Sequence, residues 1–550
     1  MSWMMPSYRL MDWPHKPSKR YDLYLYREQG WDIGDTVSGH PVIFIPGNAG
    51  SYQQVRSIAS SASHQFHGEP GGQEEDMVDA KKLDFFTVDL NEEFSAFDAR
   101  TLREQAKFIQ ACITRVIQEY DHLDTSDRPQ QVTLLAHSMG GIVARLAIDY
   151  STTNLVDVVF TMSTPHLLPP LTLEYGMDDI YRTINVPPKS SNHPLLFSLC
   201  GGISDEQVVS DSCALSANVV KPGDGFAAFT TGVPGVWTGV DHQAMVWCHQ
   251  IRWRVARILL DMTKSDDRGT KLLVAERWLL DNHAYSPKHH DLGYQRTLPL
   301  SNPNMTLIGQ PGSAVDMRIR QCTQKGECVE LSASRRVLPR PTNHEAPFPL
   351  PGEGIKPDEA MFAIDIATTK SSDTLSIETG ASDWLTIGES KTYVVGRHAN
   401  DAFVSHVTLD FPKFQTGSLR VQKVAAKVGD CKGSRPMLRY DTRSTDQLRA
   451  TTHESRFHPI NSDTIYLHAH SAAAPFLPDG SSSRGLRLEI YQTSDCVVNQ
   501  IEVSTDITKI LAKAVSRYRM TVIAWPVGWA AIVILWQMTT FRASGGFNFA

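Results

Sequence analysis

The chain lacks several features that would assign a function at once. Neither a C-x-x-C pair nor an H-E-x-x-H motif is present, so the sequence carries no common metal signature, and we expect neither a metal nor another cofactor. The 53 Lys and Arg against 60 Asp and Glu give a formal net charge of −7, which excludes the basic surface typical of a nucleic-acid-binding protein. No heptad array or fixed-period repeat is present, which excludes a coiled coil or a solenoid.

Cysteine is sparse, with 8 residues in a chain of 550. This number is ordinary for the length and does not decide the redox compartment. Cys322 and Cys328 are close in sequence, and Cys431 and Cys496 lie in the same later region, so disulfides are compatible with the pattern, but their connectivity cannot be deduced. The first ten residues hold no apolar stretch after a basic one, so we predict no signal peptide there.

Long apolar runs are absent except near the end of the chain, from Met520 to Met538. This run carries no charge, and its roughly 19 residues are enough to cross a hydrocarbon core of about 30 Å. Arg517 and Arg542 stand on either side of it, as basic residues flank membrane helices. We predict a transmembrane helix region over 515–541; the alternative is a buried helix of a soluble domain.

The most informative stretch is 131–150, QVTLLAHSMGGIVARLAIDY. A short apolar run suited to a strand leads through Ala-His-Ser-Met-Gly into a helical pattern, which is the G-x-S-x-G nucleophile elbow with Ala in place of the first Gly. Such a turn needs small neighbours and exposes the serine hydroxyl. We predict Ser138 as a nucleophile and the Met139 amide as an oxyanion donor; the alternative is a serine that merely begins a helix.

An earlier strand with a glycine-rich loop points to the second oxyanion donor. Residues 41–47, PVIFIPG, read as a buried strand that runs into Asn48-Ala49-Gly50. In a hydrolase sheet the loop after this strand supplies an amide to the oxyanion. We therefore nominate the amides near Asn48 and Ala49; taken alone, the loop would read as an ordinary turn.

Strand and helix signals alternate along the first 265 residues. Strands are predicted over 85–90, 158–162 and 195–200, with helices over 102–117 and 245–260. This alternation predicts a doubly wound, mostly parallel sheet with its site at the carboxyl ends of the strands. We assign residues 1–265 to an α/β-hydrolase catalytic domain.

Two partners for the serine follow in the order that this fold requires. Asp205 comes after the strand at 195–200, and His242 comes just before a helix, so the order is Ser, Asp, His. His242 would accept the Ser138 proton, and Asp205 would hold its imidazole. The alternatives for the acid are Asp178, Asp179 and Asp211. We exclude His137 and Asp241 because each is adjacent to a triad residue, and His166 because it precedes Asp205 in the chain.

The composition changes after about residue 266, where the helical pattern fades. Short β-like runs appear over 317–320, 392–395 and 406–411, and Leu486, Leu488 and Ile490 alternate as in a half-buried strand. We predict a β-sandwich-like domain over 266–510. Asn304 begins an Asn-Met-Thr triplet, a glycosylation acceptor that matters only if the chain is lumenal.

The motifs of the first half together resemble the GPI inositol-deacylase family, which are membrane-embedded serine hydrolases of the endoplasmic reticulum. The segments that carry the resemblance are PVIFIPGNAGSYQQVRSIAS, FFTVDLNEEFSAF, LLAHSMGGIVARLAI, STPH, GGISDEQVVS and VDHQAMVWC. They span roughly residues 20–265, and the later half is similar only in its plan.

This resemblance implies a reaction and a location. The enzyme would remove the fatty acyl chain from the inositol of GPI-anchored proteins, its substrates, by metal-independent ester hydrolysis with Ser138 as nucleophile. It would act on membrane lipid in the endoplasmic reticulum, with the catalytic domain lumenal, in anchored-protein maturation, export and quality control. Two alternatives remain: a membrane-tethered lipase or acyltransferase for another lipid, and a non-catalytic sorting receptor with a relic triad.

The sequence departs from the family plan at both ends. Family members carry a membrane helix before the hydrolase and several at the C-terminus, so we expect an incomplete chain. The basic residues Lys509, Lys513, Arg517 and Arg519 precede the apolar run and only Arg542 follows it, a count that places the hydrolase in the cytosol. We give precedence to the family topology, because further helices would affect orientation.

Overall fold

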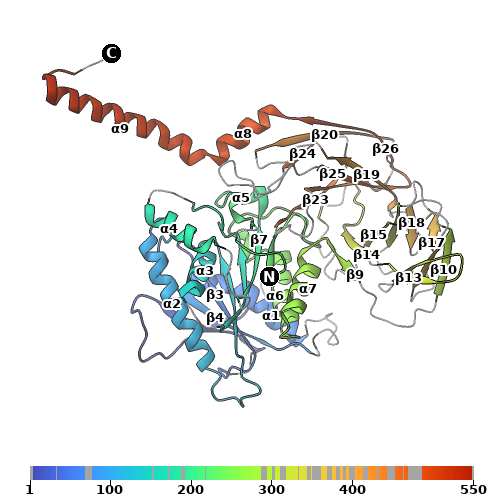
Figure 1. Ribbon diagram of the computed structural model, residues 1–550. Helices are drawn as coiled ribbons and strands as arrows, with labels where there is room; N and C mark the ends of the chain where they lie inside the picture. Colours follow the sequence, from blue (N-terminus) through green and yellow to red (C-terminus); the bar gives the residue numbers. More distant parts are fainter. Residues whose placement is uncertain are drawn as a thin grey trace.

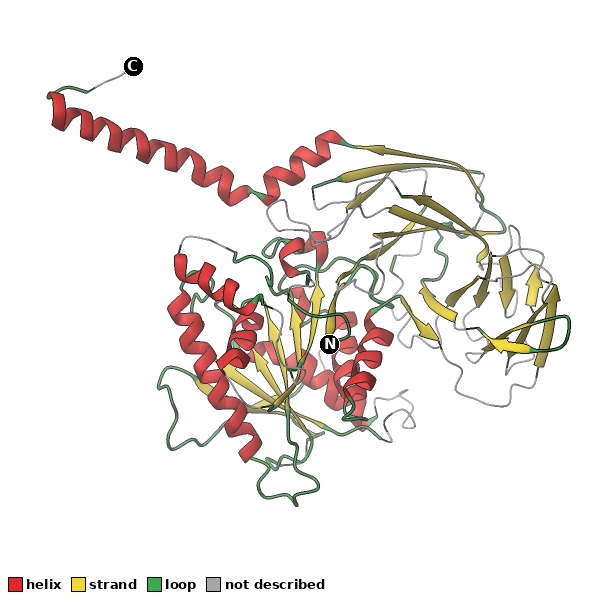
Figure 2. Cartoon of the chain, in the orientation of Figure 1, coloured by secondary structure: helices red, strands yellow, loops and turns green. Residues whose placement is uncertain are grey.

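The first half of the chain forms eight strands of one mixed sheet, to which the second half adds a ninth, β22 (Figure 2). The strand order is β1-β2-β4-β3-β5-β6-β7-β8-β22. The strands are β1 (Pro6–Leu10), β2 (Asp22–Glu28), β3 (His40–Ile45), β4 (Leu83–Asp89), β5 (Val132–His137), β6 (Val156–Met162), β7 (Leu195–Cys200), β8 (Gly225–Phe229) and β22 (Thr452–His453). Only β2 is antiparallel to both of its neighbours; from β4 to β22 all pairs are parallel. This order is that of an α/β hydrolase, so the predicted fold class is confirmed.

The computed structural model describes residues 4–547 with gaps. Outside the described part lie residues 1–3, 33, 69–76, 78, 151–153, 171–173, 187–192, 217–218, 286–293, 300–303, 310–316, 332, 344–347, 350–360, 368–373, 380–384, 388–391, 396–402, 413–418, 430, 432, 443–451, 462–463, 469–485 and 548–550.

Helices cover both faces of this sheet (Figure 1). They are α1 (Arg56–His67), α2 (Ala99–Gln118), α3 (Gly140–Tyr150), α4 (Tyr175–Ile184), α5 (Ser210–Cys213), α6 (His249–Met262) and α7 (Arg268–Leu279). Apolar residues of α2, α3 and α4 form one core with the sheet, and those of α1, α6 and α7 form a second core on its other face. Asp98 caps α2 by accepting hydrogen bonds from the backbone N–H groups of Arg100 and Thr101.

The second half of the chain is built of antiparallel strands, with one parallel pair, in four further sheets. Their orders are β10-β16-β12-β13, β17-β18-β11-β15-β14-β9, β19-β25-β21-β23 and β24-β20-β26. The strands are β9 (Asn282–Tyr285), β10 (Tyr294–Pro299), β11 (Asn304–Gly309), β12 (Met317–Cys322), β13 (Cys328–Glu330), β14 (Ala333–Leu338), β15 (Met361–Ala367), β16 (Thr374–Thr379), β17 (Leu385–Ile387), β18 (Thr392–Val395), β19 (Phe403–Phe411), β20 (Val421–Val428), β21 (Met437–Thr442), β23 (Ser455–Pro459), β24 (Ile465–His468), β25 (Leu486–Thr493) and β26 (Val498–Thr505). The β-rich character expected after residue 266 is present, although helix α7 still packs on the hydrolase core.

A buried ionic cluster lies where the two halves meet. The Arg439 guanidinium donates to both carboxylate oxygens of Asp281, at 2.7 and 3.2 Å, and to Glu489 at 3.0 Å. Arg336 lies 3.3 Å from the other oxygen of Glu489. Burial raises the pKa of Glu489, but the charges of Arg336 and Arg439 outweigh it and lower that pKa to about 2. The cluster is thus ionised and joins the end of the α7 segment to strands β21 and β25.

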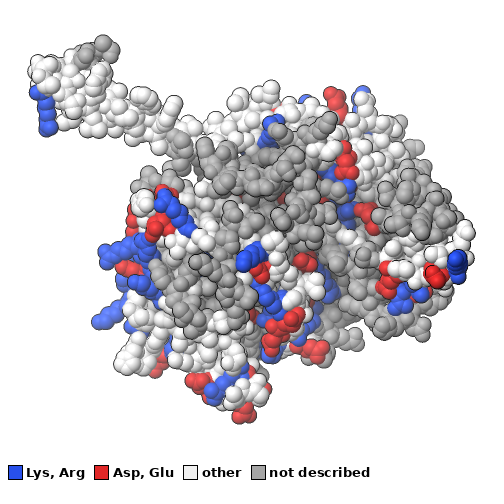
Figure 3. All heavy atoms as spheres, in the orientation of Figure 1, with Lys and Arg blue, Asp and Glu red and all other residues white. Residues whose placement is uncertain are grey.

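Two helices end the described chain. Helix α8 (Ile507–Arg517) is followed by α9 (Arg519–Ser544), which projects away from the rest of the molecule (Figure 1). Its stretch Ala524–Ser544 is long and apolar enough to cross a membrane and is not buried against the protein. Figure 3 shows no charged side chain on the described surface of α9 up to a basic one near its far end, whereas acidic and basic residues are interspersed on the visible hydrolase surface.

Three disulfides lie in the described part of the chain. They join Cys322 to Cys328, Cys431 to Cys496, and Cys200 to Cys213. The first two pairs lie in the later region where sequence spacing was compatible with disulfides. The third joins the end of β7 to α5 and encloses the loop that carries Asp205.

Replacing Arg439 with Met is expected to lower the free energy of unfolding by about 3–5 kcal/mol, because it leaves buried Asp281 without its cation and removes one of the cations that surround Glu489. Urea unfolding of the detergent-solubilised chain measures this. The matched control is Arg103→Met in α2, whose surface ion pair with Asp179 is expected to contribute at most about 1 kcal/mol. Equal effects of the two substitutions would contradict the buried cluster.

Stability is also expected to depend on Glu489 in acid. Its folded pKa of about 2 lies below the ordinary value of 4.5, so its ionisation stabilises the fold above pH 4.5 and is lost progressively as the pH falls toward 2. Urea midpoints measured between pH 6 and pH 3 are expected to fall less steeply in Glu489→Gln than in the unmodified chain. Identical slopes would show that Glu489 titrates as it does in the unfolded chain.

Candidate active site

Ser138 stands on a sharp turn between β5, which ends at His137, and α3, which begins at Gly140. Its φ of +54° lies in the left-handed region that side chains rarely adopt. Two hydrogen bonds hold it there: its N–H donates to the Met162 carbonyl at 2.9 Å, and the Thr164 hydroxyl donates to its carbonyl at 2.8 Å. The strained turn predicted from the A-H-S-M-G motif is present.

Glycines surround this turn because no side chain fits. A Cβ on Gly47 would lie 2.6 Å from the Ser138 Cβ, and one on Gly140 would lie 2.4 Å from the Ile45 carbonyl oxygen. Real Cβ atoms essentially never come so close. The end of β3, the turn and the start of α3 are therefore packed backbone against backbone.

The three residues predicted as a triad lie together. His242 Nε2 is 3.0 Å from Ser138 Oγ, and His242 Nδ1 is 3.1 Å from Asp205 Oδ2. Their exposed fractions are 7% for Ser138 and Asp205 and 4% for His242. With the proton on Nδ1, the ring donates to the carboxylate and keeps Nε2 free to accept the serine proton.

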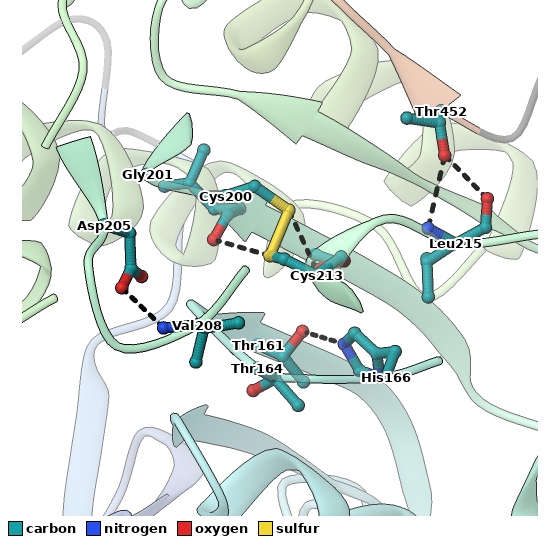
Figure 4. The surroundings of a disulfide bond; sticks show 12 residues. Thr161, Thr164, His166, Cys200, Gly201, Asp205, Val208, Cys213, Leu215 and Thr452 are labelled. Carbon is teal, nitrogen blue, oxygen red and sulfur yellow. Dashed lines mark hydrogen bonds between the residues drawn. A yellow bond between two sulfur atoms is a disulfide. The ribbon is translucent and has the colours of Figure 1, made fainter. Parts of the chain in front are cut away.

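The loop after β7 holds Asp205 in place. Its Oδ1 accepts hydrogen bonds from the backbone N–H groups of Gln207, at 3.0 Å, and Val208, at 2.9 Å. Figure 4 shows the Val208 bond beside the disulfide of Cys200 and Cys213. Burial raises the pKa of the Asp205 carboxyl, but the hydrogen bond and charge of His242 and the backbone bonds outweigh it, so the pKa lies below its ordinary value. Asp205 is therefore an ionised acceptor for His242.

His137 has a position that sequence reasoning did not foresee. Its Nε2 donates to the backbone carbonyl of His242 at 2.9 Å, and the two rings lie 4.7 Å apart. Burial, followed by the neighbouring His242, lowers the pKa of His137 to about 3. A neutral His137 can thus brace the His242 backbone without adding a second positive charge. Its adjacency to Ser138 was a signal, but adjacency alone does not reveal the contact.

The nominated oxyanion donors have different surroundings. The Ala49 N–H donates to the Glu93 carbonyl at 2.9 Å, so it is already engaged, which counts against Ala49 as a donor. The Asn48 side chain accepts from the Ala96 N–H at 2.9 Å, and this fixes the loop from the side. Among the described residues, the backbone N–H groups of Asn48 and Met139 have no hydrogen-bond acceptor.

The other candidates in the described part of the chain make no side-chain hydrogen bond to His242. His166 contacts the Thr161 hydroxyl at 2.8 Å and accepts from Arg145 at 3.2 Å (Figure 4 shows the Thr161 contact). Burial and the Arg145 charge lower the pKa of His166 well below its ordinary value. Asp179 pairs with Arg103 on the surface at 2.8 Å. None of Asp178, Asp179 and Asp211 bonds to His242 in the part of the chain described here.

The glycosylation site and the expected absence of a metal both remain predictions. Asn304, the glycosylation candidate, is the first residue of β11, and the Thr306 hydroxyl of its triplet donates to Asp365 at 2.9 Å. Over the described residues, no group of three or more His, Cys, Asp and Glu side chains is placed to hold a metal ion.

The protein is an α/β hydrolase with a serine-hydrolase-like site. This class follows from the strand order, from the turn at Ser138 and from the hydrogen bonds that join Ser138, His242 and Asp205. A family description agrees, because the PGAP1-like alpha/beta domain matches residues 36–262. The match to the crystal structure of a predicted CIB-like hydrolase from Thermoplasma acidophilum covers 48% of this chain and 99% of that protein, at 10% identity and a TM-score of 0.26. This similarity is too remote to support the assignment.

Curated relatives identify the family. A GPI inositol-deacylase of Cryptococcus neoformans var. neoformans serotype D (strain JEC21) is 47% identical over 561 residues, which cover 99% of this chain and 63% of that protein. Another, from strain B-3501A, is 54% identical over 387 residues, covering 68% of this chain and 49% of that protein. The predicted resemblance is confirmed: the chain is a relative of the GPI inositol-deacylases, and it spans less than two thirds of the length of these two proteins.

Replacing Gly140 with Ala is expected to slow the reaction of Ser138 with a fluorophosphonate probe by about 100-fold, because the new Cβ displaces the β3 end against which the turn packs. Gly429→Ala is the control, since its Cβ would meet nothing closer than 3.7 Å. Second-order labelling rates of the two variants measure the effect, and an unimpaired Gly140→Ala would contradict the packed turn.

Proposed function

We propose that the chain carries the catalytic unit of an inositol deacylase, which hydrolyses the acyl ester on the inositol of GPI-anchored proteins. The observation that carries the proposal is the hydrogen-bonded chain from Ser138 through His242 to Asp205. It lies in a chain that matches a curated GPI inositol-deacylase over 99% of its length. The geometry supports acyl transfer, and the family match supports the substrate.

In the first step Ser138 becomes acylated. His242 Nε2 accepts the hydroxyl proton while Ser138 Oγ attacks the ester carbonyl carbon, and the carbonyl oxygen becomes an oxyanion. The N–H groups of Met139 and Asn48 would donate to that oxyanion. As the tetrahedral intermediate collapses, the bond from carbon to the inositol oxygen breaks. His242 returns the proton to that oxygen, which leaves free inositol hydroxyl and acyl-Ser138.

Water completes the cycle. His242 accepts a proton from water, the hydroxide attacks the acyl carbon, and the Ser138 Oγ–carbon bond breaks with return of the proton to Oγ. The fatty acid leaves. Ionised Asp205 orients the ring and stabilises its positive form in both steps.

Disulfides and the apolar helix support a location. Disulfides persist in oxidising compartments, and three are present in the described chain, one of them next to Asp205. Helix α9 is of membrane-spanning length. We therefore propose that the hydrolase lies on the lumenal side of the endoplasmic reticulum membrane, although the distribution of Lys and Arg around the apolar run favours the cytosolic side. There it would act on newly anchored proteins before their export and in their quality control.

Replacement of Ser138 or His242 by Ala is expected to lower the turnover rate by several orders of magnitude. The double variant is expected to be no slower than either single variant, because the two groups act as a unit. Asp205→Asn is expected to lose about 10⁴-fold, through the wrong imidazole tautomer. Hydrolysis of an acylated inositol phospholipid by the purified chain measures this. Near-normal turnover in a single variant would contradict the triad.

The substrate is tested in cells that lack the native deacylase. An acylated inositol resists phosphatidylinositol-specific phospholipase C, because that enzyme uses the free 2-hydroxyl as its nucleophile. Expression of this chain, but not of Ser138→Ala, is expected to restore release of GPI-anchored proteins by the phospholipase. If neither restores release while a full-length relative does, this chain does not suffice; if the full-length relative restores release and the chain hydrolyses only other lipids, the substrate assignment is wrong.

A further inference from the structure

Trp237 belongs to the hydrolase half by sequence but to the other half by packing. It lies between β8 and His242, yet its side chain is 2% exposed and sits in an apolar core of the second half. The other members of that core are Ile308, Val337, Leu338, Met361, Ala363, Phe403, Met437, Phe457 and Tyr491. The Trp237 ring meets the Phe457 ring edge-on, with centroids 6.1 Å apart.

The backbone at Trp237 is strained. Its φ is +44°, a conformation that bulky residues rarely adopt and that persists only where the surroundings enforce it. Its N–H donates to the Val233 carbonyl at 3.1 Å, which closes a turn just before the side chain enters the core. The large buried ring and the enforced turn together fix this point of the chain.

The six residues from Trp237 to His242 lie against the loop that bears Asp205. The Val240 N–H donates to the Gly201 carbonyl at 3.0 Å, and a Cβ on Gly201 would lie 2.3 Å from the Val240 carbonyl oxygen. Gly239 is packed as closely, with its Cβ position 2.3 Å from Ser204 Oγ. A displacement of Trp237 would therefore be passed to the positions of His242 and Asp205.

The loop between β8 and His242 also contacts the second half at its start. The Thr231 hydroxyl donates to the Ser455 carbonyl at 3.1 Å, and a Cβ on Gly232 would lie 2.5 Å from Ser455 Oγ. Ser455 Oγ in turn donates to Asp281 at 2.8 Å, in the ionic cluster that joins the halves. The loop that leads to His242 is thus attached to the second half at two points.

We propose that Trp237 is a positioning residue, through which the β-rich half of the chain sets the place of His242 relative to Ser138. This inference rests on the proposed function, since it needs His242 to be the base. The second half is then part of the catalytic apparatus, although none of its described residues makes a side-chain hydrogen bond to Ser138, Asp205 or His242.

The test uses the full chain in membranes and an alkyl fluorophosphonate. In that reaction Ser138 Oγ forms a bond to phosphorus, the phosphorus–fluorine bond breaks, fluoride leaves, and His242 takes the serine proton. Both the rate constant and the final labelled fraction are measured. A purely structural role would lower the labelled fraction, because less protein is folded, and leave the rate constant unchanged.

Trp237→Ala is expected to lower the rate constant by about 10- to 100-fold with a near-complete final fraction, as a small misplacement of a catalytic group does. Phe457→Ala, which removes the contact from the other side, is expected to lower it in the same direction. Trp237→Phe is expected to stay within about threefold. The matched control is Leu467→Ala, a truncation in the second apolar core of the β-rich half, which is expected to leave the rate constant unchanged.

A wild-type rate constant in Trp237→Ala would overturn the proposal, whether the final fraction is full or reduced. A slowed Leu467→Ala would overturn it as well, because any loss of packing would then have the same effect. Failure of the proposed function looks different: labelling of the unmodified chain would be absent, or would persist in Ser138→Ala.

Discussion

The backbone turn at Ser138 is the constraint on which the rest of the site depends. A serine held at φ +54° has its hydroxyl raised above the sheet only if β3, β5 and α3 meet without side chains between them. Gly47 and Gly140 satisfy that condition, and the Thr164 hydroxyl fixes the serine carbonyl. The parallel sheet then brings the loops after β7 and β8 to the same edge, where they deliver Asp205 and His242.

The candidate active site is connected to the second half of the chain by direct contacts. The loop after β8 passes Ser455, enters the β-rich core at Trp237 and returns to the sheet edge at His242. The ionic cluster of Arg439, Asp281 and Glu489 is linked to this path through Ser455, whose hydroxyl donates to Asp281. In this chain the boundary between the two folded units crosses the segment that holds His242, the base of the proposed mechanism.

The parts that could be predicted from sequence are those encoded locally. The strand-turn-helix spacing around Ser138 and the order of Asp205 and His242 were sufficient to select three residues of which His242 bonds to the other two, at 3.0 Å to Ser138 and 3.1 Å to Asp205. The parts that could not be predicted depend on pairing across long distances. The occupied Ala49 amide depends on Glu93, the bracing role of His137 on a carbonyl 105 residues away, and the burial of Trp237 on a core formed by later strands. No periodicity or motif records such pairings, because each partner reads as an ordinary residue in its own segment.

Strand β22 has a consequence for the nascent chain. It pairs with Ala227 and Ala228 of β8 and so covers the middle of this edge of the hydrolase sheet. The two hydrogen bonds between Leu215 and Thr452 nearby span 237 residues. An uncovered edge strand is a template for pairing with another chain. At a ribosomal rate of roughly 5–20 residues per second, β8 waits on the order of 10–50 seconds for its partner. During that interval the nearly finished sheet has an open edge, and this is the period in which a chaperone would have most to protect.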